Sequence, residues 1–240
     1  FLGLIDDLKI NVRPKFRLLM MIVILIFLII YNDFFIEKTG LEFLNYLLQI
    51  DIFSLFFVCL CILFIINGSN LIDGYNGLLG IHSLVIFIIL FGINLIGEND
   101  NLSNFLLCIC IIILVFLKFN FPKAQIFLGD SGAYLVGSII AVSTIETSIA
   151  NTIVHPFFFC ILLFYIFFEV FFSFFRKILF TRQSPLFPDN QHLHMLLYKN
   201  LLKKRKNKLN SNYIVSIYIN LIYLLLITPG IIFMENGLFC

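Results

Sequence analysis

Four short polar segments interrupt this hydrophobic chain, and each holds residues that could bind a metal ion or a phosphate group. They centre on Asp6–Asp7, Asn70–Asp73, Gly129–Asp130 and His192–His194. Magnesium prefers carboxylate oxygens, N–H groups at a helix start bind phosphate, and histidine contacts or positions substrates. About two membrane crossings of roughly 20 residues fit between successive segments. An even number of crossings returns the chain to the same side. We therefore expect these segments, called islands below, to form one site at one membrane surface.

The first and third islands have the residues for a magnesium and phosphate site. The adjacent carboxylates of Asp6 and Asp7 repel each other, so one pKa would be raised unless a cation lies between them. A cap at a helix end is the alternative for this pair. Gly129, Asp130 and Ser131 begin a new apolar span, whose unpaired N–H groups suit a phosphate while Asp130 completes a metal shell. A glycine-assisted helix start is the alternative there.

The second and fourth islands suit substrate contacts. Asn70, Asp73 and Gly77 fall at helical spacing, and glycine lets backbone or ligand approach closely. The alternative, a polar turn between two spans, needs far fewer polar residues. His192 and His194 suit phosphate contacts or substrate positioning better than a closed zinc site, because no third strong ligand is adjacent. Inert loop histidines are the alternative for this pair.

The composition is that of an integral membrane protein. Hydrophobic residues make up 61% of the 240 residues, charged residues only 12%, and the mean hydropathy is +1.04. The apolar runs lack strict alternation, which favours helices over an outer-membrane barrel. The sequence thus predicts an all-α, polytopic transmembrane bundle forming a single domain, 1–240. We expect about seven spans, near 16–31, 52–66, 78–97, 104–119, 131–149, 153–175 and 213–234.

Two further features concern the start of the chain and one buried charge. The chain begins with Phe1, and the first island follows within a few residues. We therefore expect an N-terminal portion, with its spans, to be missing from this sequence. Glu169 lies in the middle of an apolar span, where an ionised carboxylate costs about 2.5–3.5 kcal/mol. It should face the bundle interior, either protonated or paired, and its role is left open.

The distribution of lysine and arginine predicts the orientation in the membrane. Of the 16 such residues, all but Lys38 should lie on the side of the islands. The positive-inside rule makes that side cytoplasmic. The basic run 199–208 favours contact with anionic lipid headgroups, with direct substrate binding as the alternative. No nucleic-acid-binding module surrounds this run, so no nucleic-acid partner is expected.

In this order and spacing, the islands resemble the motifs of the polyprenyl-phosphate N-acetylhexosamine-1-phosphate transferases. This group, glycosyltransferase family 4, includes the WecA- and TagO-like branch and, more distantly, the MraY muropeptide transferases. The resemblance covers essentially the whole chain, with the family's first spans missing. The segment SPLFPDNQHLH at 184–194 is more similar to the WecA branch than to the MraY branch. The resemblance implies a bacterial inner-membrane, multi-pass enzyme with its active site on the cytoplasmic side.

The resemblance also implies a role for each site residue. Asp6 and Asp7 match a DD motif associated with magnesium and the polyprenyl phosphate, Asp73 belongs to a motif of the NxxNxxDGxDGL type, and Asp130 matches a metal-binding GD motif. The catalytic set is Asp6, Asp7 and Asp73, and the metal ligands are Asp130, Asp73 and Asp7, for Mg²⁺ or alternatively Mn²⁺. The expected substrate-binding residues are Asn70, Asn76, Asn120, Arg17, His192 and His194.

Three positions depart from the family pattern. Asn76 replaces the second aspartate of DGxDGL, Met195 replaces the last histidine of HxHH, and Gln125 stands where a basic residue is common. Asn76 can still bind a hydroxyl group but contributes no charge. None of the three removes a candidate metal ligand. These departures bear on which donor sugar the protein uses more than on which reaction it catalyses.

The implied reaction transfers HexNAc-1-phosphate from a UDP-sugar to undecaprenyl phosphate, releases UMP and starts a lipid-linked cell-envelope glycan, such as a cell-wall polymer or O-antigen. Its partners are UDP-N-acetylhexosamine, polyprenyl phosphate and the lipid bilayer, and a homodimer is left open. Direct attack by the lipid phosphate, activated by Asp6 or Asp7, competes with a covalent aspartyl intermediate. An MraY-like muropeptide transferase is the alternative enzyme. A transporter is the alternative of another class, although transporters usually place ionisable residues near the bilayer midplane.

Overall fold

The computed structural model describes residues 2–8, 13–36, 38–182, 184, 190–205 and 207–237, excluding the side chains of Leu2, Asp6, Thr181 and Arg205. Within these ranges every regular element is a helix, as the sequence predicted. In chain order they are α1 (Leu2–Asp7), α2 (Pro14–Asn32), α3 (Glu42–Leu48), α4 (Asp51–Ile72), α5 (Leu78–Ile96), α6 (Asp100–Asn120), α7 (Gly129–Ala150), α8 (Pro156–Leu162), α9 (Phe164–Phe175), the π-helical η1 (Arg176–Thr181), α10 (Leu193–Arg205) and α11 (Lys208–Ile232).

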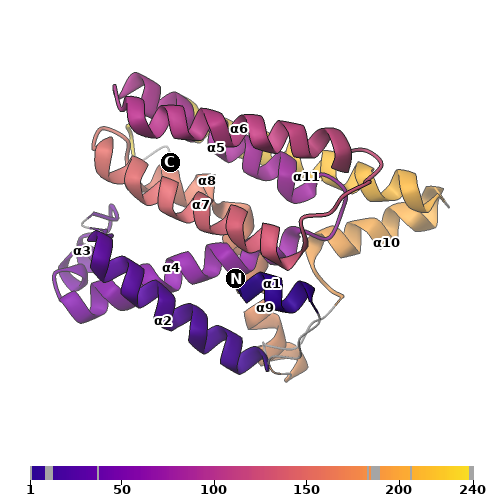
Figure 1. Ribbon diagram of the computed structural model, residues 1–240, viewed down its shortest axis with the longest axis horizontal. Coiled ribbons are helices and arrows are strands. Elements are labelled where there is room, and N and C mark those ends of the chain that lie inside the picture. The colour runs from indigo at the N-terminus through magenta and orange to yellow at the C-terminus, as the bar shows by residue number, and fades with distance from the viewer. Residues whose placement is uncertain are drawn as a thin grey trace.

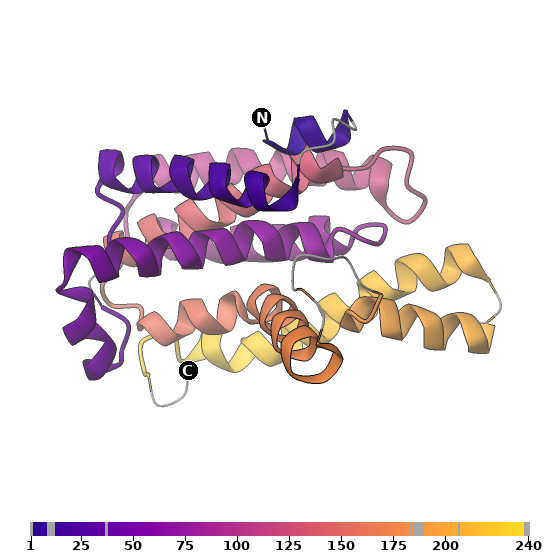
Figure 2. The same ribbon diagram turned by 90° about the horizontal axis from the view of Figure 1, so that it is seen from below.

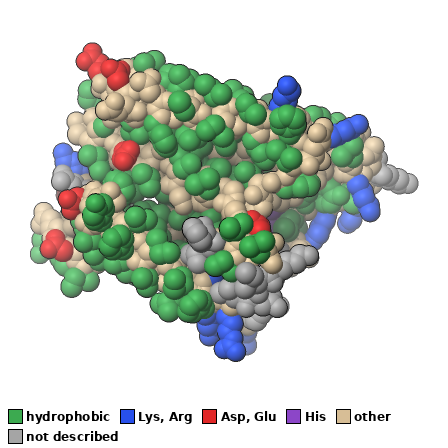
Figure 3. Space-filling view, in the orientation of Figure 1, with side chains coloured by type: hydrophobic (Ala, Val, Ile, Leu, Met, Phe, Trp, Pro, Cys, Tyr) green, Lys and Arg blue, Asp and Glu red, His purple; other side chains and the backbone are tan. Residues whose placement is uncertain are grey.

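The long helices confirm the predicted polytopic bundle. In the described part of the chain, six helices are long and apolar enough to cross a membrane, namely α2, α4, α5, α6, α7 and α11. The bent pair formed by α8 and α9 is the seventh candidate. Hydrophobic side chains cover much of the visible surface (Figure 3). Such a surface suits lipid rather than water, because a soluble protein rarely exposes large continuous apolar patches.

Two of the differences between predicted spans and observed helices affect how the site is built. The span expected at 153–175 is broken at Leu163, where α8 and the helix that follows meet at a bend of 68°. The span expected at 52–66 continues to Ile72, so Asn70 lies inside α4 rather than in a turn. An asparagine can extend this helix where its side chain bonds to the helix backbone. The Asn67 side chain, for example, donates to the Leu63 carbonyl at 2.8 Å.

Helix α4 lies at the centre of the bundle. It packs against α7, α9 and α2, while α5 packs against α6, α7 and α11. Figure 1 shows α5 and α6 side by side, α7 beside them, and then α4 and α2. Figure 2 shows α10 and the start of α11 projecting from one end. That end, called the island end below, also holds the turn between α4 and α5, the start of α7, and α1.

Small residues bring the central helices into close contact. A Cβ atom added to Gly137 of α7 would lie 2.9 Å from the Ile66 Cα atom of α4. One added to Gly68 of α4 would lie 2.5 Å from a methyl carbon of Ile166 in α9. Glycine at such contacts is the usual way in which membrane helices approach closely. The contact between α4 and α7 sets the separation of Asp73, at the end of α4, from Asp130, at the start of α7.

Candidate active site

The four islands meet at the island end, as their spacing predicted. The first contacts the third, since Asp7 accepts hydrogen bonds from Asp130 and Ser131. The second contacts the fourth, since the Tyr75 and His194 ring centroids are 5.6 Å apart. The second and third are linked electrostatically, because the charge of Asp130 acts on Asp73. Segments far apart in the sequence thus form one polar cluster at the end of an apolar bundle.

Asp7 caps the N-terminus of α7. Its Oδ1 atom accepts the Asp130 N–H at 2.9 Å, and its Oδ2 atom accepts the Ser131 N–H at 3.0 Å and the Ser131 hydroxyl. These bonds, chiefly that from the Ser131 hydroxyl, lower the Asp7 pKa despite some desolvation. A carboxylate at this position also interacts favourably with the helix dipole. Asp7 therefore acts as a helix cap, which was the alternative for this pair. The helix that it caps is α7, not α1, to which Asp7 belongs.

Close packing between α1 and α7 makes this cap geometrically feasible. A Cβ atom added to Gly3 would lie 2.5 Å from the Ser131 Cα atom, so only glycine lets the two backbones approach this closely. Gly129 adopts a left-handed φ of +65° and faces the Asp7 carboxylate. The Asp6 side chain lies outside the described part of the structure.

Asp73 and Asp130 form the acidic part of the cluster. Burial, followed by the negative charge of Asp130, raises the Asp73 pKa to about 6. Two carboxylates that disfavour each other's ionisation favour a cation between them. Among the described residues, no group of three or more His, Cys, Asp or Glu side chains could hold a metal ion. The pair still fits magnesium, which is usually held by one or two carboxylates together with water and substrate phosphates.

Asn76 and Asn120 connect the second island to the loop before α7. Asn76 is buried; its Nδ2 atom donates to the Pro122 carbonyl at 2.9 Å, and its N–H donates to Asn212 Oδ1 at 2.8 Å. Asn120 accepts the Gly77 N–H at 2.6 Å and donates to the Ile126 carbonyl at 2.7 Å. Both side chains therefore hold backbone segments in place. That these two side chains also contact the substrate stays a prediction.

Arg17 and Asn70 lie at the edges of the cluster. The Arg17 guanidinium lies 6.0 Å from the ring centre of Tyr134, one turn beyond Asp130 in α7. Asn70 is partly buried in the last turn of α4, where its carbonyl accepts the Asp73 N–H at 3.4 Å. These positions are compatible with the substrate-binding roles predicted from the resemblance, and those roles stay predictions.

The two histidines of the fourth island are buried against Glu169. His192 directly precedes α10 and His194 lies in its first turn, with 3% and 0% of their surfaces exposed. The Nδ1 atom of His192 lies 2.9 Å from Glu169 Oε2. The sequence correctly predicted that Glu169 faces inward and left open whether it is protonated or paired; the structure shows it paired with histidines that the sequence did not identify as partners. The sequence did signal that Glu169 needs a partner, because an acidic residue inside an apolar span is costly unless it is paired.

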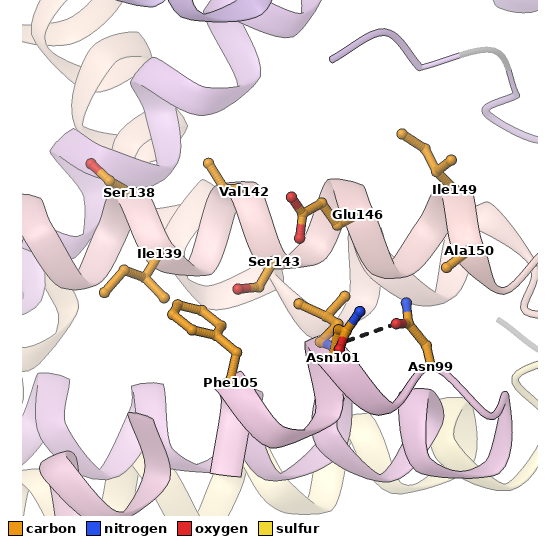
Figure 4. Close-up of a pocket in the computed structure, with 11 residues that line it drawn as sticks. Asn99, Asn101, Phe105, Ser138, Ile139, Val142, Ser143, Glu146, Ile149 and Ala150 are labelled. Carbon is orange, nitrogen blue, oxygen red and sulfur yellow. Dashed lines mark hydrogen bonds between the residues drawn. The ribbon is translucent and has the colours of Figure 1, made fainter. Parts of the chain in front are cut away.

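A cavity between α6 and α7 lies away from this cluster. It has a volume of about 690 Å³ and is lined mainly by apolar atoms, together with Ser138, Ser143 and Glu146. Figure 4 shows these side chains on α7, with Phe105 and Asn99 from the start of α6 and the turn before it facing them. The cavity therefore belongs to the half of the bundle opposite the islands, and no predicted site residue lines it.

Replacing Asn76 with aspartate is expected to lower thermal stability. The carboxylate would face the Pro122 carbonyl without a hydrogen to donate, and an unsatisfied buried acceptor costs about 1–3 kcal/mol. Thermal unfolding of the protein in detergent measures the effect. Asn104→Asp is the matched control, because Asn104 is exposed on α6. Equal melting temperatures for the two variants would contradict the assigned hydrogen bond.

Comparison with known proteins supports the resemblance. A family model described as glycosyl transferase family 4 matches residues 1–148. The undecaprenyl-phosphate alpha-N-acetylglucosaminyl 1-phosphate transferase of Thermotoga maritima is 29% identical over 138 residues, 58% of this chain and 41% of that protein. The protein of the same name from Escherichia coli O157:H7 is 25% identical over 206 residues, 83% and 55% of the two chains. The chain belongs to glycosyl transferase family 4.

The second enzyme type named by the resemblance is also among the relatives. The phospho-N-acetylmuramoyl-pentapeptide-transferase of Dictyoglomus thermophilum is 30% identical over 148 residues, 58% of this chain and 46% of that protein. The chain thus spans about half the length of the curated relatives it matches.

Proposed function

We propose that this protein transfers HexNAc-1-phosphate from a UDP-N-acetylhexosamine to undecaprenyl phosphate. An oxygen of the lipid phosphate attacks the β-phosphorus of the donor, and the bond between that phosphorus and the oxygen bridging to UMP breaks. UMP leaves, and a diphosphate joins the lipid to the sugar, which starts a cell-envelope glycan. The observation that carries this proposal is the convergence of Asp73, Asp130 and the buried histidine pair at one end of the bundle.

The acidic pair is proposed to hold a magnesium ion. Asp73 and Asp130 would be its protein ligands, with Asp7 nearby at the start of α7. Bound there, the ion would supply positive charge for the donor diphosphate and for the leaving UMP. Burial, followed by the charge of Asp130, raises the pKa of Asp73, and this supports the assignment because a bound cation would stabilise the ionised carboxylate. Manganese has similar ligand preferences and is the alternative ion.

Asp7 is proposed to act mainly by positioning. Its lowered pKa makes it a weaker base than an ordinary carboxylate, and both of its oxygens already accept hydrogen bonds from α7. Through these bonds it holds the helix whose first turn carries Asp130. Asp6 then becomes the candidate base for the lipid phosphate. A covalent aspartyl intermediate remains the competing scheme.

The island end is proposed to face the cytoplasm of a bacterial inner membrane. Most lysine and arginine side chains visible in Figure 3 lie at the right, where the α10–α11 hairpin is, and at the bottom, whereas most visible acidic side chains lie at the left. Exposed Lys199, Lys203, Lys204 and Lys208 lie along that hairpin and suit anionic lipid headgroups. This orientation gives the site access to a cytoplasmic nucleotide sugar. A homodimer, which the sequence left open, is not part of this proposal.

The arrangement favours a transferase over a transporter. Glu169, the carboxylate expected at mid-span, is directed to the histidines of the island end. The other acidic candidates, Asp7, Asp73 and Asp130, lie at helix ends, where they can act in a reaction at the membrane surface. An MraY-like transferase remains the second candidate, because relatives of that name match the chain.

The test is an assay of UMP release from membranes that contain the protein in its full natural length. The membranes receive magnesium, polyprenyl phosphate and a panel of UDP-sugars that includes UDP-N-acetylmuramoyl-pentapeptide. We expect UMP release with a UDP-N-acetylhexosamine and its loss when the metal is chelated or the lipid omitted. Release only with the muropeptide donor would establish the second candidate. No release with any donor would contradict the proposed function.

A further inference from the structure

One buried carboxylate joins the second half of the broken span to the fourth island. Glu169 of α9 has none of its surface exposed. Its Oε2 atom lies 2.9 Å from His192 Nδ1. Its Oε1 atom accepts the Leu193 N–H at 3.1 Å and the Tyr165 hydroxyl at 3.2 Å, and His194 Nδ1 lies 3.4 Å from the same oxygen. Donors from α9 and from the start of α10 therefore converge on a single side chain.

This convergence fixes which nitrogen of each histidine faces the carboxylate. An ionised carboxylate only accepts hydrogen bonds, so each ring presents a hydrogen on Nδ1 to Glu169. The Tyr165 hydroxyl donates to Glu169, which leaves its oxygen, 3.5 Å from His194 Nδ1, as a second acceptor for that ring. The two imidazole rings stack with centroids 5.4 Å apart and planes 4° from parallel. Both rings are thereby held in one orientation, with Nε2 directed away from Glu169.

The Nε2 atom of His194 lies beside the turn of the second island. It is buried and has no hydrogen-bond partner among the described residues. A Cβ atom added to Gly74 would lie 3.6 Å from it, so the backbone at residue 74 passes close to this nitrogen. Buried polar atoms in native proteins are nearly always paired. An unpaired ring nitrogen beside Gly74, the residue after the candidate metal ligand Asp73, therefore points to a group that the substrate supplies.

We propose that Glu169 is a positioning residue that aims His194 Nε2 at a phosphate oxygen of the substrate, beside the Asp73–Gly74 turn. This inference rests on the proposed function. With a phosphate oxygen on one side and Glu169 on the other, the ring has an acceptor at each nitrogen. It then donates a hydrogen bond from both, the arrangement in which a carboxylate orients a working histidine. The phosphate belongs either to the donor diphosphate or to the lipid acceptor.

Glu169→Gln in the full-length protein tests the inference, with Glu146→Gln as the matched control. Glu146 is the comparable glutamate within α7, but it lines the distant cavity (Figure 4). We expect Glu169→Gln to reduce kcat/KM on the order of 10- to 100-fold, the range for losing a group that orients a histidine ligand. A raised KM for the UDP-sugar identifies the donor phosphate, and a raised KM for the lipid identifies the acceptor phosphate. Glu146→Gln should retain wild-type kinetics.

A second readout does not depend on catalysis. Nitrogen-15 spectra of labelled histidine in lipid nanodiscs show which ring nitrogen carries hydrogen, and single substitutions assign the 4 histidines. We expect hydrogen on Nδ1 of His192 and His194 in the wild type and a changed pattern in Glu169→Gln. A bare Nδ1 on His194 in the wild type would overturn the inference even if the enzyme releases UMP. If the wild type shows the expected pattern but releases no UMP, the proposed function fails while the positioning by Glu169 stands.

Gly74→Ala provides a variant that leaves Glu169 intact. The added methyl group would contact His194 at 3.6–3.7 Å, an ordinary van der Waals distance, so the fold should tolerate it. It would lie beside the Nε2–Cδ2 edge of the ring, where it narrows the approach to Nε2, and it should raise the same KM as Glu169→Gln. Wild-type kinetics in both variants would contradict the assigned role of His194.

Discussion

Replacing Asp130 with asparagine is expected to reduce magnesium-dependent UMP release on the order of 10²- to 10³-fold, the loss typical of removing one group that stabilises developing charge. The asparagine keeps the size of the side chain and leaves the backbone bond to Asp7 in place. It removes the negative charge that acts on Asp73. Initial rates measured across a range of magnesium concentrations quantify the effect, and manganese binding measured by electron paramagnetic resonance gives an independent readout.

The matched control for this prediction is Asp100→Asn. Asp100 also lies in the first turn of a long helix, but α6 begins at the end of the bundle opposite the islands. The control should retain the wild-type rate and the wild-type affinity for manganese. Wild-type turnover by Asp130→Asn would show that this carboxylate is not needed for the reaction.

Replacing Gly137 with alanine is expected to destabilise the bundle and to impair catalysis together. The new Cβ atom would lie 2.9 Å from the Ile66 Cα atom, and backbone cannot move aside as a flexible side chain can. Overpacking of this kind typically costs about 1–3 kcal/mol. Because α4 carries Asp73 and α7 carries Asp130, a shift between the helices also separates the acidic pair. A displacement of about 1 Å at a catalytic site can cost roughly 10²-fold in rate.

Gly92→Ala is the control for packing, because a Cβ atom there would meet nothing within 4 Å. It should leave the rate unchanged and slightly raise stability, since alanine in a helix is favoured over glycine by roughly 0.5–1 kcal/mol. Thermal unfolding in detergent and initial rates compare the two variants. Indistinguishable behaviour of Gly137→Ala and Gly92→Ala would contradict the close packing of α4 on α7.

Much of the fold could be predicted from the sequence because membrane spans are continuous apolar runs of a length set by the bilayer. The clustering of the islands followed from counting crossings between them. The break at Leu163 left no such signal, since the residues around it are uniformly apolar. The continuation of α4 through Asn67 to Ile72 was hidden because polar residues there resemble a loop until their neighbouring helices are known.

The candidate site was predictable in its residue types but not in its hydrogen bonds. Asp7 was expected to be a metal ligand or a helix cap, and only the packing of α1 on α7 identifies the helix it caps. Glu169 and His192 are separated by 23 residues, and no local pattern links them. Asn76 departs from the family aspartate, and its bond to Pro122 gives a physical reason, because an aspartate could not donate to that carbonyl. The hydrogen bonds of Asp7, Glu169 and Asn76 all join segments that are distant in the sequence, so only the tertiary structure reveals them.

The central claim is the transfer of a sugar phosphate rather than of a sugar alone, and the mass of the lipid product tests it most directly. Membranes containing the full-length protein are incubated with magnesium, undecaprenyl phosphate and UDP-N-acetylglucosamine or UDP-N-acetylgalactosamine. We predict a lipid whose mass increases by one HexNAc-phosphate unit, formed in equal amount to UMP. A lipid that gains only the sugar, with release of UDP, or no lipid product from any UDP-N-acetylhexosamine, would contradict the account.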